Sequence, residues 1–108
     1  MLNKLFFLND VLESEHPYAN NMDETKTYVY DGECVSIGVT FLEDTETESG
    51  WDYFYIYDTN DNQIAQYSGT ELAGQIITVP GNTVKTRLTS DGSVTRNGCR
   101  AGSIVVNK

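Results

Sequence analysis

Alternation of apolar and polar residues in short segments is the feature that most limits how this chain can fold. From Val35 to Phe41 every second residue is apolar, and in the segment 53–57 Phe54 and Ile56 alternate with three tyrosines. A period of two is typical of a strand with one buried face. Further strands are expected at 63–67, 75–79 and 84–88, each bounded by turn-forming residues. Short strands with frequent turn signals predict an antiparallel β-sandwich.

The residue types agree with an all-β fold. Valine, isoleucine and threonine together number 27, whereas alanine and leucine number 11. β-Branched side chains suit a pleated sheet, while alanine and leucine favour helices. The only segment with room for a helix is 5–12, and the strand-rich composition argues against a helix there. With 108 residues the chain has room for one domain around one core.

The net charge excludes two classes of partner. Sixteen acids against seven bases give a formal charge of −9. Nucleic-acid binding and polybasic membrane anchoring both need clustered positive charge, and no apolar run approaches the roughly 20 residues that span a bilayer. No lysine or arginine occurs between Thr27 and Val84, where ten acids lie, and Asp91 is the only acid from Lys85 onward. We therefore expect neither nucleic-acid binding nor membrane insertion.

An acidic segment from Glu43 to Asp52 holds five carboxylates and no base. Such groups repel one another unless water, salt or a cation compensates. Calcium would do so, because it takes six to eight oxygen ligands; the alternative is a solvated surface loop. The segment 58–62 imitates the start of an EF-hand loop, but Gln63 and Gly69 stand where that loop needs glycine and glutamate. This second segment is predicted to be a hairpin turn.

Enzyme chemistry has little support in the sequence. His16 is the only histidine, so a multi-histidine metal site is impossible. A catalytic cysteine would need a positioned base, and nothing near Cys34 or Cys99 supplies one. These two cysteines lie 65 positions apart and form either one disulfide, worth about 4 kcal/mol on the chain-entropy model, or two thiols. We expect a noncatalytic domain.

Aromatic residues cluster around one predicted strand. Trp51, Tyr53, Tyr55 and Tyr57 would provide a platform for a glycan if their rings lay free on one sheet face. The alternative is that these rings pack against neighbouring strands, as cross-strand aromatic pairs commonly do. The sequence leaves both interpretations open.

An ordered set of motifs between Glu13 and Ser103 resembles CUB domains, which are extracellular sandwiches of about this length. The central motif is the segment 51–58, preceded by Thr47 and Glu48. The other motifs that carry the resemblance are the segments 16–21, 67–70, 79–84 and 88–93. The resemblance implies a jelly-roll-like, CUB-type antiparallel β-sandwich.

Many CUB domains bind one calcium ion, and the resemblance implies a ligand set for it here. The matching acids are Glu48, Asp52 and Asp91; the backbone carbonyl of Ser93 would add a ligand, and Tyr18 would orient the carboxylates. The length of the acidic loop leaves Glu46 or Asp44 as register alternatives to Glu48.

The resemblance further implies a protein partner that presents lysine or arginine, within a larger secreted or cell-surface protein. The family's usual disulfides are missing and Trp51 stands where tyrosine is usual, which suggests a bacterial-type or divergent member. Carbohydrate binding and a ligand-free spacer are the alternative functions.

We expect residues 1–12 to be an extended or loosely attached N-terminal segment without a signal peptide. Residues 13–103 would form the CUB-like domain, and 104–108 would be a strand end or a linker to a following domain.

Overall fold

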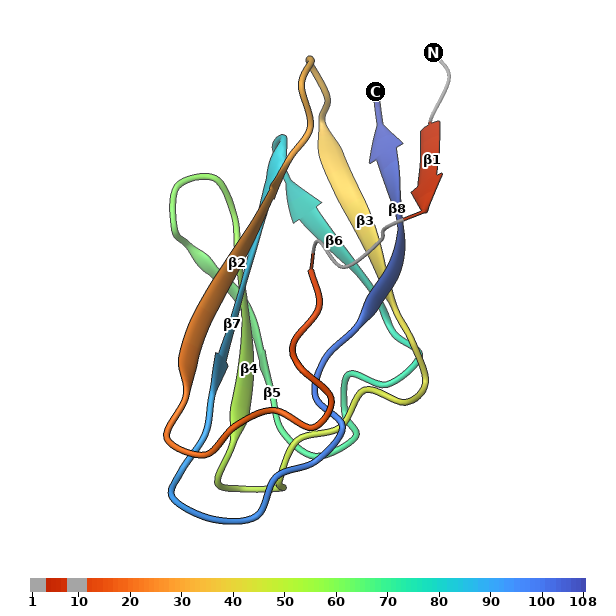
Figure 1. The fold of residues 1–108 in the computed structure, drawn as a ribbon. Helices are drawn as coiled ribbons and strands as arrows, with labels where there is room; N and C mark the ends of the chain where they lie inside the picture. The colour runs from red at the N-terminus through yellow and green to blue at the C-terminus, as the bar shows by residue number, and fades with distance from the viewer. Residues whose placement is uncertain (1–3, 8–11) are drawn as a thin grey trace.

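Two four-stranded antiparallel sheets pack against each other in the computed structural model, which describes residues 4–7 and 12–108 (Figure 1). The first sheet contains, in spatial order, β1 (Lys4–Phe7), β8 (Ala101–Asn107), β3 (Ser36–Phe41) and β6 (Ile76–Pro80). The second contains β2 (Asp23–Val29), β7 (Thr83–Thr89), β4 (Tyr53–Tyr57) and β5 (Gln63–Tyr67). The predicted antiparallel β-sandwich is confirmed.

The strands with apolar alternation lie where the sequence predicts them. The predicted hairpin of 53–57 with 63–67 forms as β4 and β5, in which Phe54 and Ile56 are buried. Between these strands the Asp58 carboxylate accepts the backbone N–H groups of Asn60 and Asn62, each at 2.9 Å. This is a turn closed on its own aspartate, as predicted, so that carboxylate is occupied by hydrogen bonds within the loop.

The sequence pattern predicts no strand at β2, and a helix is considered where β1 lies. The inward-facing positions of β2 include Glu24 and Lys26, which form an ion pair at 3.8 Å, so the half-buried face of this strand is not apolar. The helix considered for 5–12 is wrong where the structure describes it, because Lys4–Phe7 pairs with β8 as a strand. Residues 8–11 lie outside the described residues. No helix long and apolar enough to cross a membrane occurs in the described ranges 4–7 and 12–108.

The core lies between the two sheets. Phe41 of β3 and Phe54 of β4 meet edge to face, with ring centroids 5.6 Å apart. Ile104 and Val106 of β8 are fully buried, and β8 lies between β1 and β3 in the first sheet. The segment 104–108, for which a strand end or a linker is expected, includes the end of β8, and two of its residues belong to the core.

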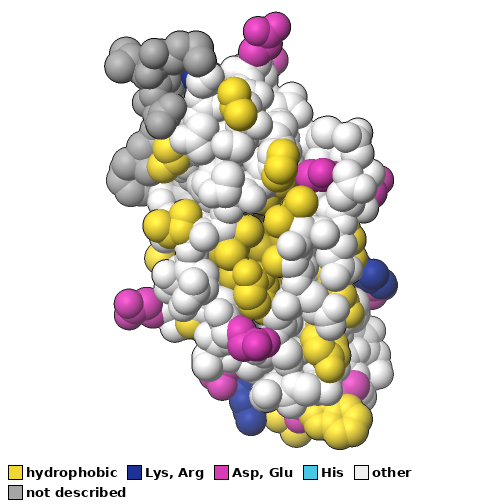
Figure 2. All heavy atoms as spheres, turned by 180° about the vertical axis from the view of Figure 1, so that it is seen from behind, with side chains coloured by type: hydrophobic (Ala, Val, Ile, Leu, Met, Phe, Trp, Pro, Cys, Tyr) yellow, Lys and Arg dark blue, Asp and Glu magenta, His cyan; other side chains and the backbone are white. Residues whose placement is uncertain are grey.

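One edge of each sheet carries apolar side chains that the core covers only in part. The edge strand β5 contributes Ile64, Ala65 and Tyr67, and the edge strand β6 contributes Ile77. Figure 2 shows apolar side chains gathered in the middle of the face opposite to that of Figure 1. The four residues of β5 and β6 pack against the core from the margins of the sandwich.

The two cysteines are free thiols, so the disulfide considered from the sequence does not form. Cys34 precedes β3 and Cys99 precedes β8. Since β3 and β8 are antiparallel, with Ser36 opposite Asn107, the cysteines lie near opposite ends of the same strand pair. At about 3.4 Å per residue this separates them by roughly 20 Å, well beyond the limit of about 7 Å between bridged Cα atoms.

Two valines, one within β3 and one just before it, test how much of the stability of the sandwich comes from its buried core. Val39 is fully buried, whereas Val35 is 70% exposed. We expect Val39→Ala to lower the free energy of unfolding by about 2 kcal/mol, because it removes buried methyl groups and leaves a cavity. Val35→Ala, the same chemical change, should alter it by less than about 0.5 kcal/mol. Urea denaturation of both variants measures the difference; equal effects would contradict this description of the core.

Candidate metal centre

Three carboxylates converge at one end of the sandwich. Glu48 and Asp52 belong to the loop between β3 and β4, and Asp91 follows β7. One carboxylate oxygen from each lies within 4.8 Å of the others. The loops that carry them meet at the lower end of the molecule in Figure 1. The structure thus brings together the three acids that the sequence analysis selected.

A tight turn holds Glu48 and Asp52 side by side. The backbone N–H groups of Trp51 and Asp52 both donate to the Glu48 carbonyl, at 3.2 and 3.0 Å. The hydroxyls of Thr47 and Ser68 each donate to the Asp52 carbonyl at 3.0 Å. The backbone on both sides of the Asp52 side chain is therefore fixed by hydrogen bonds.

Asp52 is fully buried. Each of its two carboxylate oxygens accepts one hydrogen bond. The Tyr18 hydroxyl donates to Oδ2 at 2.6 Å, and the Asp91 backbone N–H donates to Oδ1 at 2.9 Å. The same Tyr18 oxygen accepts the Glu48 backbone N–H at 3.0 Å. Burial raises the pKa of Tyr18 far above its ordinary value, with the Asp52 hydrogen bond as the next cause. Tyr18 therefore stays a neutral donor that orients Asp52.

Glu48 is the electrostatically unsatisfied member of the three. Its Oε1 atom is buried and has no hydrogen-bond partner. Loss of hydration raises the pKa of Glu48, and repulsion from Asp91 and Asp52 raises it further. Asp91 in turn accepts the Ser93 backbone N–H at 3.3 Å, so its loop folds back on its own carboxylate. The arrangement offers oxygen ligands and excess negative charge at one point.

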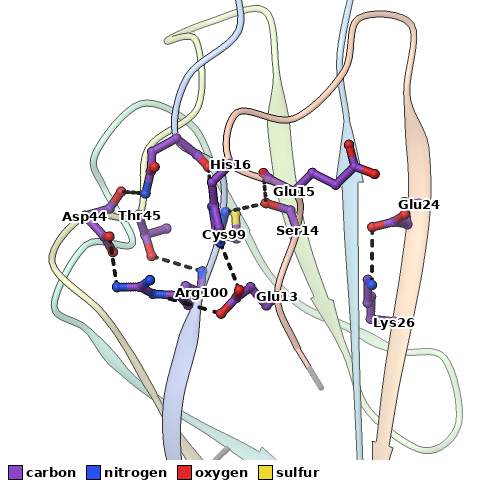
Figure 3. Close-up of polar contacts among 11 residues, drawn as sticks. Glu13, Ser14, Glu15, His16, Glu24, Lys26, Asp44, Thr45, Cys99 and Arg100 are labelled. Carbon is purple, nitrogen blue, oxygen red and sulfur yellow. Dashed lines mark hydrogen bonds and ion pairs between the residues drawn. The ribbon is translucent and has the colours of Figure 1, made fainter. Parts of the chain in front are cut away.

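The two register alternatives to Glu48 lie elsewhere, in ion pairs. Glu46 lies 3.8 Å from Arg96, and its backbone pairs with Gly98. Asp44 lies 3.1 Å from Arg100, which also approaches Glu13 at 4.0 Å (Figure 3). Arginines compensate these acids, whereas no described lysine or arginine forms an ion pair within 4.0 Å of the three converging carboxylates.

The segment that delivers Tyr18 is fastened to the strand region before β8 (Figure 3). Ser14 and Cys99 exchange two hydrogen bonds, from the Ser14 N–H to the Cys99 carbonyl and from the Cys99 N–H to the Ser14 hydroxyl, both at 2.9 Å. His16 donates through Nδ1 to the Asn97 carbonyl at 2.6 Å and lies 3.1 Å from Glu13. These contacts fix the path of the chain before Tyr18 enters the site.

The aromatic residues do not form one free platform. Tyr53, Tyr55 and Tyr57 follow one another along β4 with successive ring centroids 6.3 Å apart. Arg87 lies over the Tyr55 ring at 5.6 Å and is held by Asp23 through two hydrogen bonds of 2.7 and 2.8 Å. The middle ring is therefore covered, in line with the packing interpretation. Trp51 lies in the loop before β4 and is 67% exposed.

Sequence reasoning assigned no role to Ser68 or Thr47, although both hydroxyls hold the Asp52 carbonyl. Ser68 lies 16 positions after Asp52, and only the fold brings the two together. A serine in a turn-forming segment carries no local signal for this contact.

Comparison with solved structures assigns the fold. The full extracellular region of zebrafish Gpr126/Adgrg6 matches with a TM-score of 0.68 and 19% identity, over 97% of this chain and 13% of that one. The MASP-1 CUB2 domain bound to Ca²⁺ matches with a TM-score of 0.66 and 14% identity, over 98% of this chain and 92% of that domain. The CUB1-EGF-CUB2 structure of human MASP-1/3 matches with a TM-score of 0.65 and 16% identity, over 96% of this chain and 40% of that one.

At these identities the likeness establishes the CUB fold and not a function. The chain spans only 13% of the zebrafish extracellular region. A search of curated protein sequences finds no match. A family model matches residues 8–103, nearly the whole chain. The chain therefore belongs to the family described as the "Uncharacterized protein E02H4.4 C-terminal domain" and has the fold of a CUB domain.

Proposed function

We propose that this domain is a noncatalytic interaction module that binds one Ca²⁺ ion through Glu48, Asp52 and Asp91. One observation carries the proposal: three carboxylates approach within 4.8 Å while a buried oxygen of Glu48 has no partner. A buried, unpaired carboxylate oxygen is costly. A bound cation removes that cost and the mutual repulsion together.

The donor set fits calcium better than the other common metals. All three side chains offer oxygen, and the cluster contains no cysteine or histidine of the kind that zinc and copper sites use. Calcium accepts six to eight oxygens in flexible geometry, and the Ser93 carbonyl and water would complete the set. Magnesium demands a near-ideal octahedron and keeps several waters, so three converging carboxylates suit it less.

The comparisons support a calcium-dependent interaction role. The MASP-1 CUB2 domain, which shares the fold, was solved bound to Ca²⁺. Calcium would leave the three carboxylates with one net negative charge, and a lysine or arginine of a protein partner would pair with it. Dissociation constants of 10⁻⁴ to 10⁻³ M, on the order typical of extracellular modules, would make the site useful outside the cell. We therefore propose an extracellular or cell-surface location.

A noncatalytic role fits the state of the titratable groups. Both ring nitrogens of His16, the only histidine in the sequence, face oxygen atoms of Asn97 and Glu13. The Cys99 thiol is buried, which raises its pKa well above the ordinary value and keeps it protonated. Neither residue is available as a base or a nucleophile.

Calcium binding is tested first by thermal unfolding with 10 mM Ca²⁺ or with EDTA. If the dissociation constant is about 10⁻⁴ to 10⁻³ M, calcium stabilises the native state by about 1.4 to 2.7 kcal/mol. We expect a rise of several degrees in Tm for the parent and none for Asp52→Asn. Asp44→Asn, the control, should keep the full rise because Asp44 pairs with Arg100. A parent protein indifferent to calcium would leave the spacer and carbohydrate functions.

Repulsion among the carboxylates predicts an unusual pH dependence of the calcium-free protein. The pKa of Glu48 is raised by folding, so between its unfolded value of 4.5 and the higher folded value the native state binds more protons. The contribution of Glu48 to stability therefore increases as the pH falls through this window. Glu48→Gln should raise Tm at pH 7 without calcium. It should also abolish the part of the pH dependence of stability that comes from protonation of Glu48. Glu46→Gln is the control; if both variants give the parent's pH profile, Glu48 is not strained by its neighbours.

Tyr18 is predicted to position the metal ligands. Tyr18→Phe removes the donor to Asp52 and the acceptor for the Glu48 N–H while keeping the buried ring. We expect a loss of roughly 1–3 kcal/mol in stability and about 10- to 100-fold weaker calcium binding. Tyr53→Phe, which removes only an exposed hydrogen bond to the Gly50 carbonyl, is the matched control. Isothermal titration should show unchanged affinity for Tyr53→Phe; unchanged affinity for Tyr18→Phe would contradict the positioning role.

A further inference from the structure

Two exposed apolar side chains lie on the loops that hold the three carboxylates. Trp51 directly precedes Asp52 and is 67% exposed, and Val94 follows Asp91 by three residues and is 44% exposed. These loops meet at the lower end of the molecule, where Figure 2 shows apolar, acidic and basic side chains close together. The candidate metal centre therefore has large apolar groups on both of its loops.

Val94 is held in a backbone conformation that its side chain disfavours. Its φ is +60°, in the left-handed region, which is a genuine outlier for a β-branched residue. Such conformations cost on the order of 1–3 kcal/mol and occur mainly at functional sites. The cost is not recovered by burial, because nearly half of Val94 faces solvent. Folding alone gives no reason for valine at this position.

Trp51 is likewise exposed without a gain in folding. It is the only tryptophan in the sequence and lies at the tip of the turn that holds Glu48 beside Asp52. Gly50, with φ of +82°, allows the sharp turn before it. Exposed tryptophan is characteristic of contact residues that dominate binding energy.

The charge around these residues selects the chemistry of the partner. Glu48, Asp52 and Asp91 would keep one net negative charge with one Ca²⁺ bound, and Arg96 in the same region is paired with Glu46 and only partly offsets the rise in the pKa of Glu48. An acidic centre with apolar flanks complements a basic side chain with apolar neighbours. Its negative charge disfavours anionic lipid surfaces, which are another common binding partner of exposed tryptophan.

We propose that Trp51 and Val94 form an apolar rim that binds the residues flanking a lysine or arginine of a protein partner. This inference rests on the proposed function and extends it, because the rim sets which basic segments are accepted. The partner segment carries a large aliphatic or aromatic side chain next to its basic residue. The rim supplies the selectivity that a single charge pair lacks.

The test uses three immobilised ten-residue peptides with one central lysine, flanked by phenylalanine, serine or glutamate. With 5 mM Ca²⁺ the parent domain should bind the phenylalanine-flanked peptide at least about tenfold more tightly than the serine-flanked one. Trp51→Ser and Val94→Asn should reduce this preference to about twofold or less. Val94→Asn should also raise Tm, because asparagine tolerates positive φ. The control variants Val29→Ser and Val35→Ser alter valines that are 57% and 70% exposed at the opposite end of the sandwich, and they should keep the parent's preference.

The outcomes separate the rim from the metal site. If calcium raises Tm but the parent binds the phenylalanine- and serine-flanked peptides equally, or binds none, the rim is overturned and the metal site stands. If calcium has no effect on Tm, the proposed function itself fails. Vesicles of phosphatidylcholine with or without phosphatidylserine are the last probe. Binding to them that depends on Trp51 and Val94, without peptide binding, would make this end a membrane-docking surface and overturn the protein partner.

Discussion

The arrangement of the loops depends on the buried carboxylate of Asp52. Its oxygens accept hydrogen bonds from Tyr18 and from the Asp91 backbone, and its carbonyl accepts those of Thr47 and Ser68. An ionised group without exposure to water is tolerated only with such partners. Four chain segments must therefore meet around one side chain. The same hydrogen bonds that satisfy Asp52 bring the acids of two loops together.

Bringing these acids together destabilises the protein at Glu48. Each carboxylate oxygen of Asp52 has one hydrogen-bond donor, yet its position places Glu48 against two like charges, and one Glu48 oxygen is buried without a partner. In a loop that served only solubility, the acids would face water. Asp44 and Glu46 are of this kind: each is partly exposed and lies beside an arginine. The structure thus distinguishes acids that maintain the surface from acids held together at a cost. A cost of this kind is expected at a binding site.

Much of the fold could be predicted because apolar and polar residues alternate along its central strands. Phe54 and Ile56 identify β4 from the sequence alone, whereas β2 turns the charged Glu24 and Lys26 inward and so hides its period. The choice of Glu48 over Glu46 and Asp44 came from the family resemblance, since spacing alone cannot fix the register of a loop. Ser68 could not be found at all, because its contact with Asp52 depends on how two loops pack.

The uneven distribution of charge along the sequence finds its explanation in the pairs that the fold creates. The bases concentrated after Val84 pair with acids from other strands and loops: Lys85 with Asp61, Arg87 with Asp23, Arg96 with Glu46 and Arg100 with Asp44. None of these ion pairs includes Glu48, Asp52 or Asp91, although the charge of Arg96 partly offsets the rise in the pKa of Glu48. Asp91 is the one acid within the basic stretch, and it joins the other two rather than a neighbouring base. The described residues give this cluster no ion-pair partner, and the proposed Ca²⁺ ion would supply the missing positive charge.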